Sequence, residues 1–177
     1  MKTITNFAKI SLLSVSLFIA SCSSDDAADI VDTGAPTSGS YITAKVDGAD
    51  FSSIIYGVAS SASATRMETG AGTMITVLGA DQSANSIVIN LMGITTAGTY
   101  TINPNVDSVM AYTPVTGGVS YGTGECSGST GTITITTIDN DKIEGTFSFS
   151  GKDADTCPTS ATKSVTQGSF RGVFSQQ

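Results

Sequence analysis

Cys22 has the surroundings of a cysteine that is acylated in a bacterial lipoprotein. It follows Leu17–Ser21, an apolar run that ends in small residues, and Lys2 and Lys9 supply positive charge further upstream. A positive segment, a short apolar core and a small-residue cleavage site are typical of an export signal. We therefore expect residues 1–21 to be a lipoprotein signal peptide. Cys22 would then be the mature N-terminus, carrying lipid such as palmitate.

The apolar core Ile10–Ala20 is too short for a membrane-spanning helix, which needs about 20 apolar residues. The alternative is an ordinary secretory signal followed by release, in which Cys22 would be coincidental. Acylation contributes about 0.8 kcal/mol per buried CH₂, so two or three chains anchor a protein stably. We therefore expect the membrane to be a partner of the mature chain, through its N-terminal lipid.

Cys126 and Cys157 are the two remaining cysteines, and in an exported chain an even pair indicates a disulfide. Extending the pairing of a hairpin predicted below places Cys126 opposite Ala154, three residues from Cys157. A bridge there would close the open end of the hairpin and stabilise the domain by about 3–4 kcal/mol. The competing interpretation is two thiolates on a metal, but zinc would need two more ligands and the chain has no histidine.

The absence of histidine removes several classes of catalytic site. Ser-His-Asp and Cys-His activation, histidine general bases and most catalytic zinc or iron sites need an imidazole. A carboxylate pair or a Ser-Lys dyad stays open. The segment Gly122–Gly124 resembles part of a phosphate-binding loop, but it lacks the Walker lysine and the strand-loop-helix context. We interpret it as a turn.

The acidic residues form no evident catalytic or metal-binding set. Asp139–Asp141 and Asp153–Asp155 could offer oxygens to calcium, but calcium takes about six to eight oxygen ligands and neither run completes a known loop. Turn chemistry explains these residues without a metal. Glu68, Glu125 and Glu144 are too scattered to nominate a pair for glycoside hydrolysis. We therefore expect no catalytic residue, no metal and no cofactor.

Four tyrosines, Tyr56, Tyr100, Tyr112 and Tyr121, could form a platform for sugar rings, although the chain has no tryptophan. At strand spacing, most tyrosines are packing residues. The net charge of −7 and the scattered basic residues argue against a nucleic-acid partner, because phosphates would be repelled.

Composition changes along the chain and predicts its organisation. Residues 22–40 hold the candidate lipidated cysteine and then a stretch rich in Ser, Asp, Ala, Thr and Gly, which we expect to be a flexible acidic linker because it buries little apolar surface. Residues 41–177 have the length of one domain, and their apolar residues recur mostly with the period of a strand.

The first predicted hairpin begins at Tyr41, where apolar and polar residues alternate as far as Val46. The dipeptide Asp47-Gly48 then supplies a two-residue turn in which both residues need positive φ. Folding back about this turn pairs Ala44 with Phe51 on the apolar face. We leave the Ala- and Ser-rich segment 54–67 unassigned. Further strands are expected at 74–78, 86–92, 99–102, 109–113 and 165–174, the second of them central and the last with a bulge at Gly168.

The clearest unit is the hairpin Gly131–Ser150, with its turn at Asp139–Asp141. Ile138 has the wrong parity relative to Ile135, and a bulge at Thr136-Thr137 restores it by adding one residue to that strand. The predicted pairs are then Ile133 with Phe147, Ile135 with Gly145 and Ile138 with Ile143.

Roughly eight to ten short strands without a helical stripe predict an all-β fold, an antiparallel β-sandwich. A closed lipocalin-like β-barrel is the alternative.

Several segments resemble an uncharacterised family of surface lipoprotein domains from Bacteroidota. The run Cys22–Asp26 is similar to the signal that exports lipoproteins of this phylum to the cell exterior. The segments Ala44–Phe51, Gly98–Tyr100, Gly131–Ile135 and Gly145–Phe149 are similar to the strands of such a domain. The resemblance implies an all-β domain in the outer membrane, lipid-anchored and exposed on the cell surface. It implies no site residue beyond Cys22.

Three functions are consistent with these observations. We expect a non-enzymatic binding or accessory module that presents loops to a glycan, a peptide or another surface partner. A barrel that carries a small apolar ligand is the first alternative. A hydrolase that uses carboxylates instead of histidine is the second, and it requires two acids to converge in a cleft.

Overall fold

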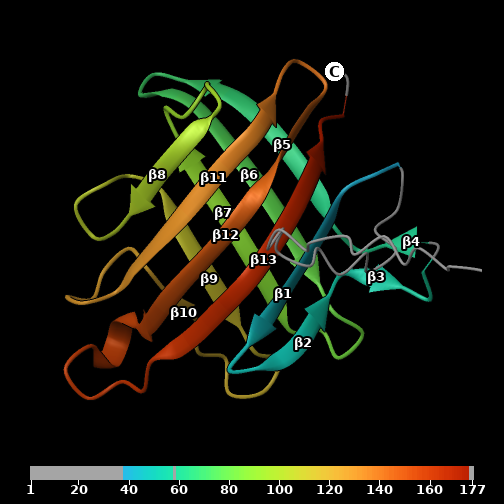
Figure 1. Ribbon diagram of the computed structural model, residues 1–177. Helices are drawn as coiled ribbons and strands as arrows, with labels where there is room; N and C mark the ends of the chain where they lie inside the picture. Colours follow the sequence, from blue (N-terminus) through green and yellow to red (C-terminus); the bar gives the residue numbers. More distant parts are fainter. Residues whose placement is uncertain (1–37, 58, 176–177) are drawn as a thin grey trace, which may run out of the picture. The chain divides into compact units, whose positions relative to one another are not determined.

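The computed structural model describes residues 38–57 and 59–175, and these residues form thirteen strands and one short 3₁₀ helix (Figure 1). Cys22 and most of the predicted linker lie outside the described residues. In chain order the elements are β1 Tyr41–Val46, β2 Ala49–Ser52, β3 Ile54–Ile55, β4 Ala59–Ser60, β5 Ser63–Thr69, β6 Gly72–Ala80, β7 Ser86–Met92, β8 Gly98–Ile102, β9 Val109–Thr113, β10 Tyr121–Gly122, β11 Thr130–Ile138, β12 Lys142–Asp153, η1 Ala154–Thr156 and β13 Lys163–Val173.

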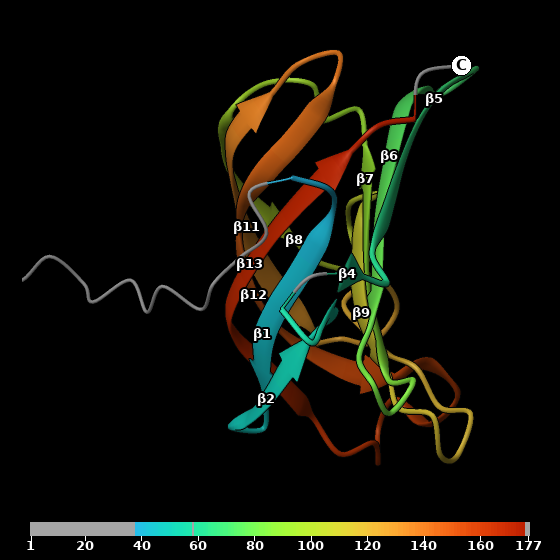
Figure 2. The same cartoon turned by 90° about the vertical axis from the view of Figure 1, so that its right-hand side faces the viewer.

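The larger strands form two layers (Figure 2). The front sheet, which faces the reader in Figure 1, has the order β2-β1-β13-β12-β11-β8. The back sheet has the order β10-β9-β7-β6-β5. All strand pairs are antiparallel, as predicted, and the two layers are joined where the end of β12 pairs with β10. The sheet therefore curls from one layer into the other as a half-barrel, which combines features of the predicted sandwich with those of the barrel alternative.

The core lies between the two layers and follows from the alternation of the strands. Every second side chain of β6, β7, β11 and β12 is buried, and these residues pack into one contiguous cluster. Its largest fully buried members are Phe170, Ile42, Ile75, Ile87, Ile89, Leu91, Ile102, Met110, Ile133, Ile135, Ile143 and Val77. The opposite side chains of the same strands form the two outer faces of the domain.

The local predictions for the hairpins are confirmed. Asp47 and Gly48 both have positive φ, of 49° and 86°, and Ala44 pairs with Phe51. In β11 the register shifts at the predicted bulge, and the predicted pairs Ile133 with Phe147, Ile135 with Gly145 and Ile138 with Ile143 are present. Strand β7 is central, as expected, with neighbours β6 and β9.

The structure adds two details that the pattern does not give. The predicted bulge in β13 is present, but its positive φ falls on Gln167 rather than on Gly168. The unassigned segment 54–67 forms the small hairpin β3–β4 and the start of β5. Along the part of the chain described here, no helix has the length and apolar character needed to cross a membrane.

Candidate binding surfaces

The outer face of the front sheet carries an uninterrupted row of hydroxyl side chains. Each member lies directly opposite the next one on the neighbouring strand, so the row crosses all six strands of the sheet. From β8 to β2 the row is Thr99, Thr134, Thr146, Ser169, Thr43 and Ser52. We call the outer face around this row the hydroxyl face.

A concavity of about 220 Å³ lies beside this row. Six hydroxyl residues from three adjacent strands line it, together with the core-facing residues between them, Gly131, Phe149 and Val165. The hydroxyl residues are Thr130, Thr132, Ser148, Ser150, Ser164 and Thr166. The bulge at Gln167 lies next to it in β13. The concavity presents hydroxyl groups without a charged residue in its lining.

Some hydroxyl groups of this face bond to one another across strands. The Thr99 and Thr134 hydroxyls lie 3.0 Å apart, and the Tyr41 and Ser169 hydroxyls lie 3.4 Å apart. Because a hydroxyl group both donates and accepts, each can exchange such a bond for one to a ligand that also carries hydroxyls.

Ion pairs border the hydroxyl face. At one end, Glu144 accepts hydrogen bonds from Arg171 Nε at 2.5 Å and from Lys142 Nζ at 3.0 Å. Burial opposes ionisation of the Glu144 carboxyl, but these two bonds lower its pKa overall. At the other end, Lys45 Nζ lies 2.7 Å from Asp50 Oδ1. A further pair lies on the inner side of β13, where Lys163 Nζ is 2.7 Å from Asp47 Oδ2, which lowers the pKa of the Asp47 carboxyl and raises the pKa of Lys163. The paired charges therefore flank the hydroxyl row, and Lys45 lies opposite Thr166 beside the concavity.

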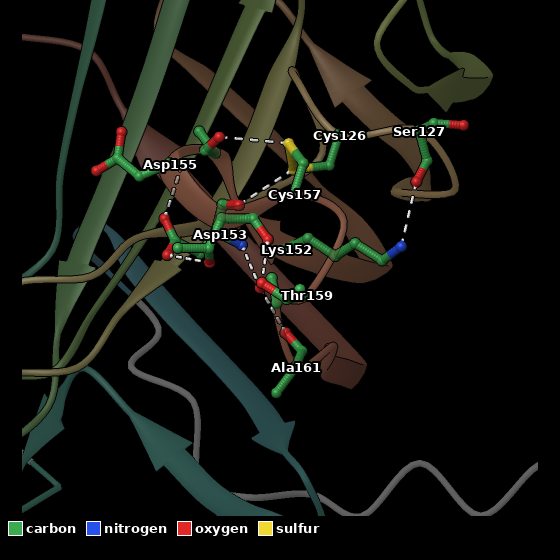
Figure 3. The surroundings of a disulfide bond; sticks show 11 residues. Cys126, Ser127, Lys152, Asp153, Asp155, Cys157, Thr159 and Ala161 are labelled. Carbon is green, nitrogen blue, oxygen red and sulfur yellow. Dashed lines mark hydrogen bonds between the residues drawn. A yellow bond between two sulfur atoms is a disulfide. The ribbon is translucent and has the colours of Figure 1, made fainter.

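The predicted disulfide between Cys126 and Cys157 is present at the corner where the sheets join (Figure 3). The two Cα atoms are 5.2 Å apart, and the Cys126 sulfur lies 3.2 Å from the Asp153 carbonyl oxygen. Asp153 caps η1 by accepting from the Asp155 N–H at 3.0 Å. The bridge thus ties the loop before β11 to the loop after β12, as the hairpin pairing predicted.

Beside this corner, a second hollow of about 290 Å³ opens on the outer side of β9 and β10. Small residues form its floor, with Gly124 so close that a Cβ there would lie 2.8 Å from Val109 Cγ2. Glu125 and Lys152 contribute its charged groups, and Lys152 Nζ donates to the Ser127 carbonyl oxygen at 3.2 Å. This hollow is mixed in character, whereas the concavity on the front sheet is hydroxyl-lined.

Comparison with protein families identifies the family to which this domain belongs. A family described as "Domain of unknown function (DUF6252)" matches residues 42–174, from β1 to the end of β13. The chain belongs to this family. The match confirms the expectation of an uncharacterised domain, and neither a curated protein nor a solved structure matches the chain. The description names no activity, so function has to be argued from the surfaces of the DUF6252 domain.

The DUF6252 domain brings only two of the four candidate tyrosines together. Tyr112 and Tyr121 lie opposite each other on β9 and β10, and Lys163 Nζ lies 5.8 Å from the centre of the Tyr121 ring. Burial raises the pKa of the Tyr112 hydroxyl, and the charge of Asp81 adds to the effect. Tyr100 packs on the core, and Tyr56 is 84% exposed in the loop between β3 and β4. A platform of four tyrosines does not form, and Tyr100 and Tyr112 pack against the core, as expected for tyrosines at strand spacing.

The candidate acids of the DUF6252 domain act in turns and ion pairs. The Asp139 carboxylate accepts from the N–H groups of Asp141 and Lys142, which lowers the pKa of Asp139. Glu68 accepts from the Thr73 hydroxyl at 2.8 Å. Among residues 38–57 and 59–175, no group of three His, Cys, Asp or Glu side chains is placed to hold a metal ion. Gly122 ends β10, and the buried Thr123 beside it accepts from the Met110 N–H at 3.0 Å.

Sequence reasoning missed the hydroxyl row of the DUF6252 domain, although part of its signal was available. The pairing of Ile133 with Phe147 already places Thr134 opposite Thr146 and Thr132 opposite Ser148. The neighbours β8, β13 and β1 come from distant parts of the chain, and no local pattern aligns them with this hairpin.

Proposed function

We propose that this protein is a lipid-anchored lipoprotein of the outer membrane, exposed on the cell surface, and that its DUF6252 domain is a non-enzymatic binding module for a neutral glycan. The sequence around Cys22 supports the anchor. The disulfide supports export, because such bonds persist in oxidising compartments.

The observation that carries the glycan assignment is the hydroxyl row across six strands, with the hydroxyl-lined concavity beside it. A glycan presents hydroxyl groups at every ring, each able to donate and accept. An anionic ligand would need basic residues in the lining of the concavity, and its lining holds none. A neutral, polyhydroxylated chain therefore matches this face best.

The expected free energy of binding indicates what kind of glycan is bound. A hydrogen bond to a ligand contributes about 0.5–1.5 kcal/mol net, because each group gives up water. Six hydroxyl residues line the concavity, and no side chain in that lining presents an aromatic ring on which a sugar could stack. A single sugar would bind weakly, so we expect an extended polysaccharide that repeats the contact along the sheet.

The two alternative functions receive less support. The space between the layers of the described domain is filled by one cluster of buried side chains, which weighs against a carrier barrel. The carboxyls whose pKa is shifted, Asp47, Asp139 and Glu144, are all shifted downward. A general acid needs a raised pKa, so these acids lack the property that a hydrolase would require.

The glycan assignment is tested with the mature chain carrying Cys22→Ser, by affinity electrophoresis through neutral and anionic polysaccharides. We expect retardation by at least one neutral polymer, and loss of most of it in the Thr132→Val/Ser148→Ala double variant. Thr65→Val, on the outer side of β5, removes a hydroxyl from the opposite face and should bind normally. Equal binding by the double variant, or no retardation across the neutral panel, would overturn the assignment.

The anchor is tested separately in cells. Cys22→Ser should move the protein from the membrane fraction to the soluble fraction, and mass spectrometry of the parent should find an acylated Cys22. Firm membrane retention of the variant would refute the anchor and leave the glycan assignment untouched.

A further inference from the structure

The bulge in β13 presents one more outward side chain than a regular strand would. Val165 and Gly168 are buried, whereas Thr166 and Gln167 between them are both exposed. On β12 the residue between their partners is Ser148, so two outward residues of β13 lie opposite one. The bulge therefore adds Gln167 to the outer face, beside two residues that line the concavity, Thr166 and Ser148.

The backbone conformation at Gln167 is unfavourable for a glutamine. Its φ of 51° lies in the left-handed region, where a residue with a Cβ meets a steric cost that glycine avoids. The adjacent glycine serves close packing instead, because a Cβ on Gly168 would lie 2.5 Å from the Phe147 carbonyl oxygen. Stability alone would favour a glycine at position 167 too. Strained residues of this kind concentrate at binding sites, which directs attention to the side chain.

The carboxamide of Gln167 is available to a ligand. Within the part of the chain that the structure describes, it takes part in no hydrogen bond. A carboxamide holds an acceptor oxygen and a donor NH₂ group side by side in one plane. Two neighbouring hydroxyls of a sugar ring offer the complementary donor and acceptor. The hydroxyl groups of Thr166 and Ser148 can rotate, whereas the planar carboxamide fixes the directions of both bonds at once.

We propose that Gln167 determines the specificity of the hydroxyl face by binding two neighbouring hydroxyls of one sugar ring. This inference rests on the proposed function and narrows it to neutral polysaccharides whose rings carry free vicinal hydroxyls. The nearby charge agrees with a neutral ligand. Lys45 lies opposite Thr166 on β1, and Asp50 neutralises it at 2.7 Å.

The experiment measures dissociation constants of the mature chain carrying Cys22→Ser by affinity electrophoresis in dextran, pullulan, galactomannan and hydroxyethylcellulose. Gln167→Met keeps the length of the side chain but removes the carboxamide. One hydrogen bond to a neutral group changes affinity roughly two- to tenfold, so losing two should weaken binding at least fivefold. Gln82→Met, in the exposed turn between β6 and β7, is the matched control and should bind within twofold of the parent.

Gln167→Gly separates binding from stability. It should also bind at least fivefold more weakly, although its thermal midpoint should rise because the backbone strain is relieved. A residue that only shapes the bulge would not lose binding while the fold becomes more stable. Weaker binding together with a lower midpoint would therefore overturn the proposal.

A chemically altered polymer tests the class of ligand. Periodate cleavage followed by borohydride reduction opens the rings at vicinal hydroxyls and leaves a neutral, hydroxylated chain. The preference for the untreated polymer should be at least threefold greater in the parent than in Gln167→Met. Equal preferences, or binding by Gln167→Met within twofold of the parent, would overturn the role of Gln167 and leave the glycan assignment standing. A parent that no neutral polymer retards would overturn both.

Discussion

The hydroxyl face and the outer face of β5, β6, β7 and β9 stand on the same alternation of inward and outward side chains, yet they differ in chemistry and in regularity. On the second face, Met67, Met74 and Met92 lie opposite one another. The strands beneath the hydroxyl face have register shifts in β11 and β13. The ladders of β5, β6, β7 and β9 run without any shift. A bulge bends a strand and increases its local twist. The front sheet therefore has bulged strands beside its hydroxyl-lined concavity, whereas β5, β6, β7 and β9 pair in regular register and the hollow of the back sheet lies at its edge, over β9 and β10.

The difference shows that core packing constrains only one side of each strand. Ile133 and Ile135 point into the core from the strand that presents Thr132 and Thr134 outward. Ile87 and Ile89 likewise point into the core from the strand that presents Val88 and Asn90 outward. Stability of the fold therefore leaves the outer composition open, so the two faces can differ in chemistry.

Removing the disulfide should have the largest effect, because the bridge lies at the corner that holds the two faces in one domain. The Cys126→Ser/Cys157→Ser variant should lose about 3–4 kcal/mol of unfolding free energy, as expected for a loop of 31 residues. Urea unfolding measures the loss, and the unmodified protein in reductant should match the variant. A loss below about 1 kcal/mol would mean that the β10–β12 pairing alone holds the corner.

How much of the two faces the sequence predicts depends on how far apart in the chain the interacting residues lie. The sequence predicts both tight hairpins, the bulge in β11 and the disulfide. These features depend on residues close together in the chain, because side-chain parity and turn chemistry are local. The hydroxyl row needs β8 beside β11 and β1 beside β13, and these pairings join residues far apart in sequence. The segment 54–67 stayed unassigned because its short strands have no extended alternation. The conformation of Gln167 was also unexpected, because glycine is the usual residue for positive φ.

Substitutions at the bulge in β13 should have the next largest effect on the unfolding free energy, and they change the front sheet alone. A Cβ on Gly168 would lie 2.5 Å from the Phe147 carbonyl oxygen, so Gly168→Ala should cost about 1–3 kcal/mol. Gln167 has a φ of 51°, so Gln167→Gly should relieve strain and stabilise the fold by up to about 1 kcal/mol. Chemical denaturation measures both variants. If both variants stabilise the fold, or both destabilise it, then the close contact at Gly168 and the strained backbone at Gln167 do not govern the stability of the bulge.

Acid should act on the border of the hydroxyl face and not on the outer face of β5, β6, β7 and β9, whose outward positions are uncharged. The pKa of the Glu144 carboxyl is lowered in the folded protein, so its contribution is present above the ordinary carboxyl pKa and is lost as pH falls through the lowered value. Glu144→Gln should cost about 0.5–1 kcal/mol at neutral pH and less in acid. Unfolding free energies measured from neutral pH downward test this. A constant difference between variant and parent would contradict it.

The smallest effect on stability tests the comparison most directly. Thr146→Val and Met67→Thr each change one exposed outer side chain, and both should alter the unfolding free energy by less than about 0.5 kcal/mol. The binding readouts should then separate. Thr146→Val should weaken retardation by a neutral polysaccharide, while Met67→Thr should leave it unchanged. If both variants instead shift stability by more than about 1 kcal/mol, the outer compositions serve the fold. If they are neutral in every assay, the contrast between the two faces reflects strand propensity alone.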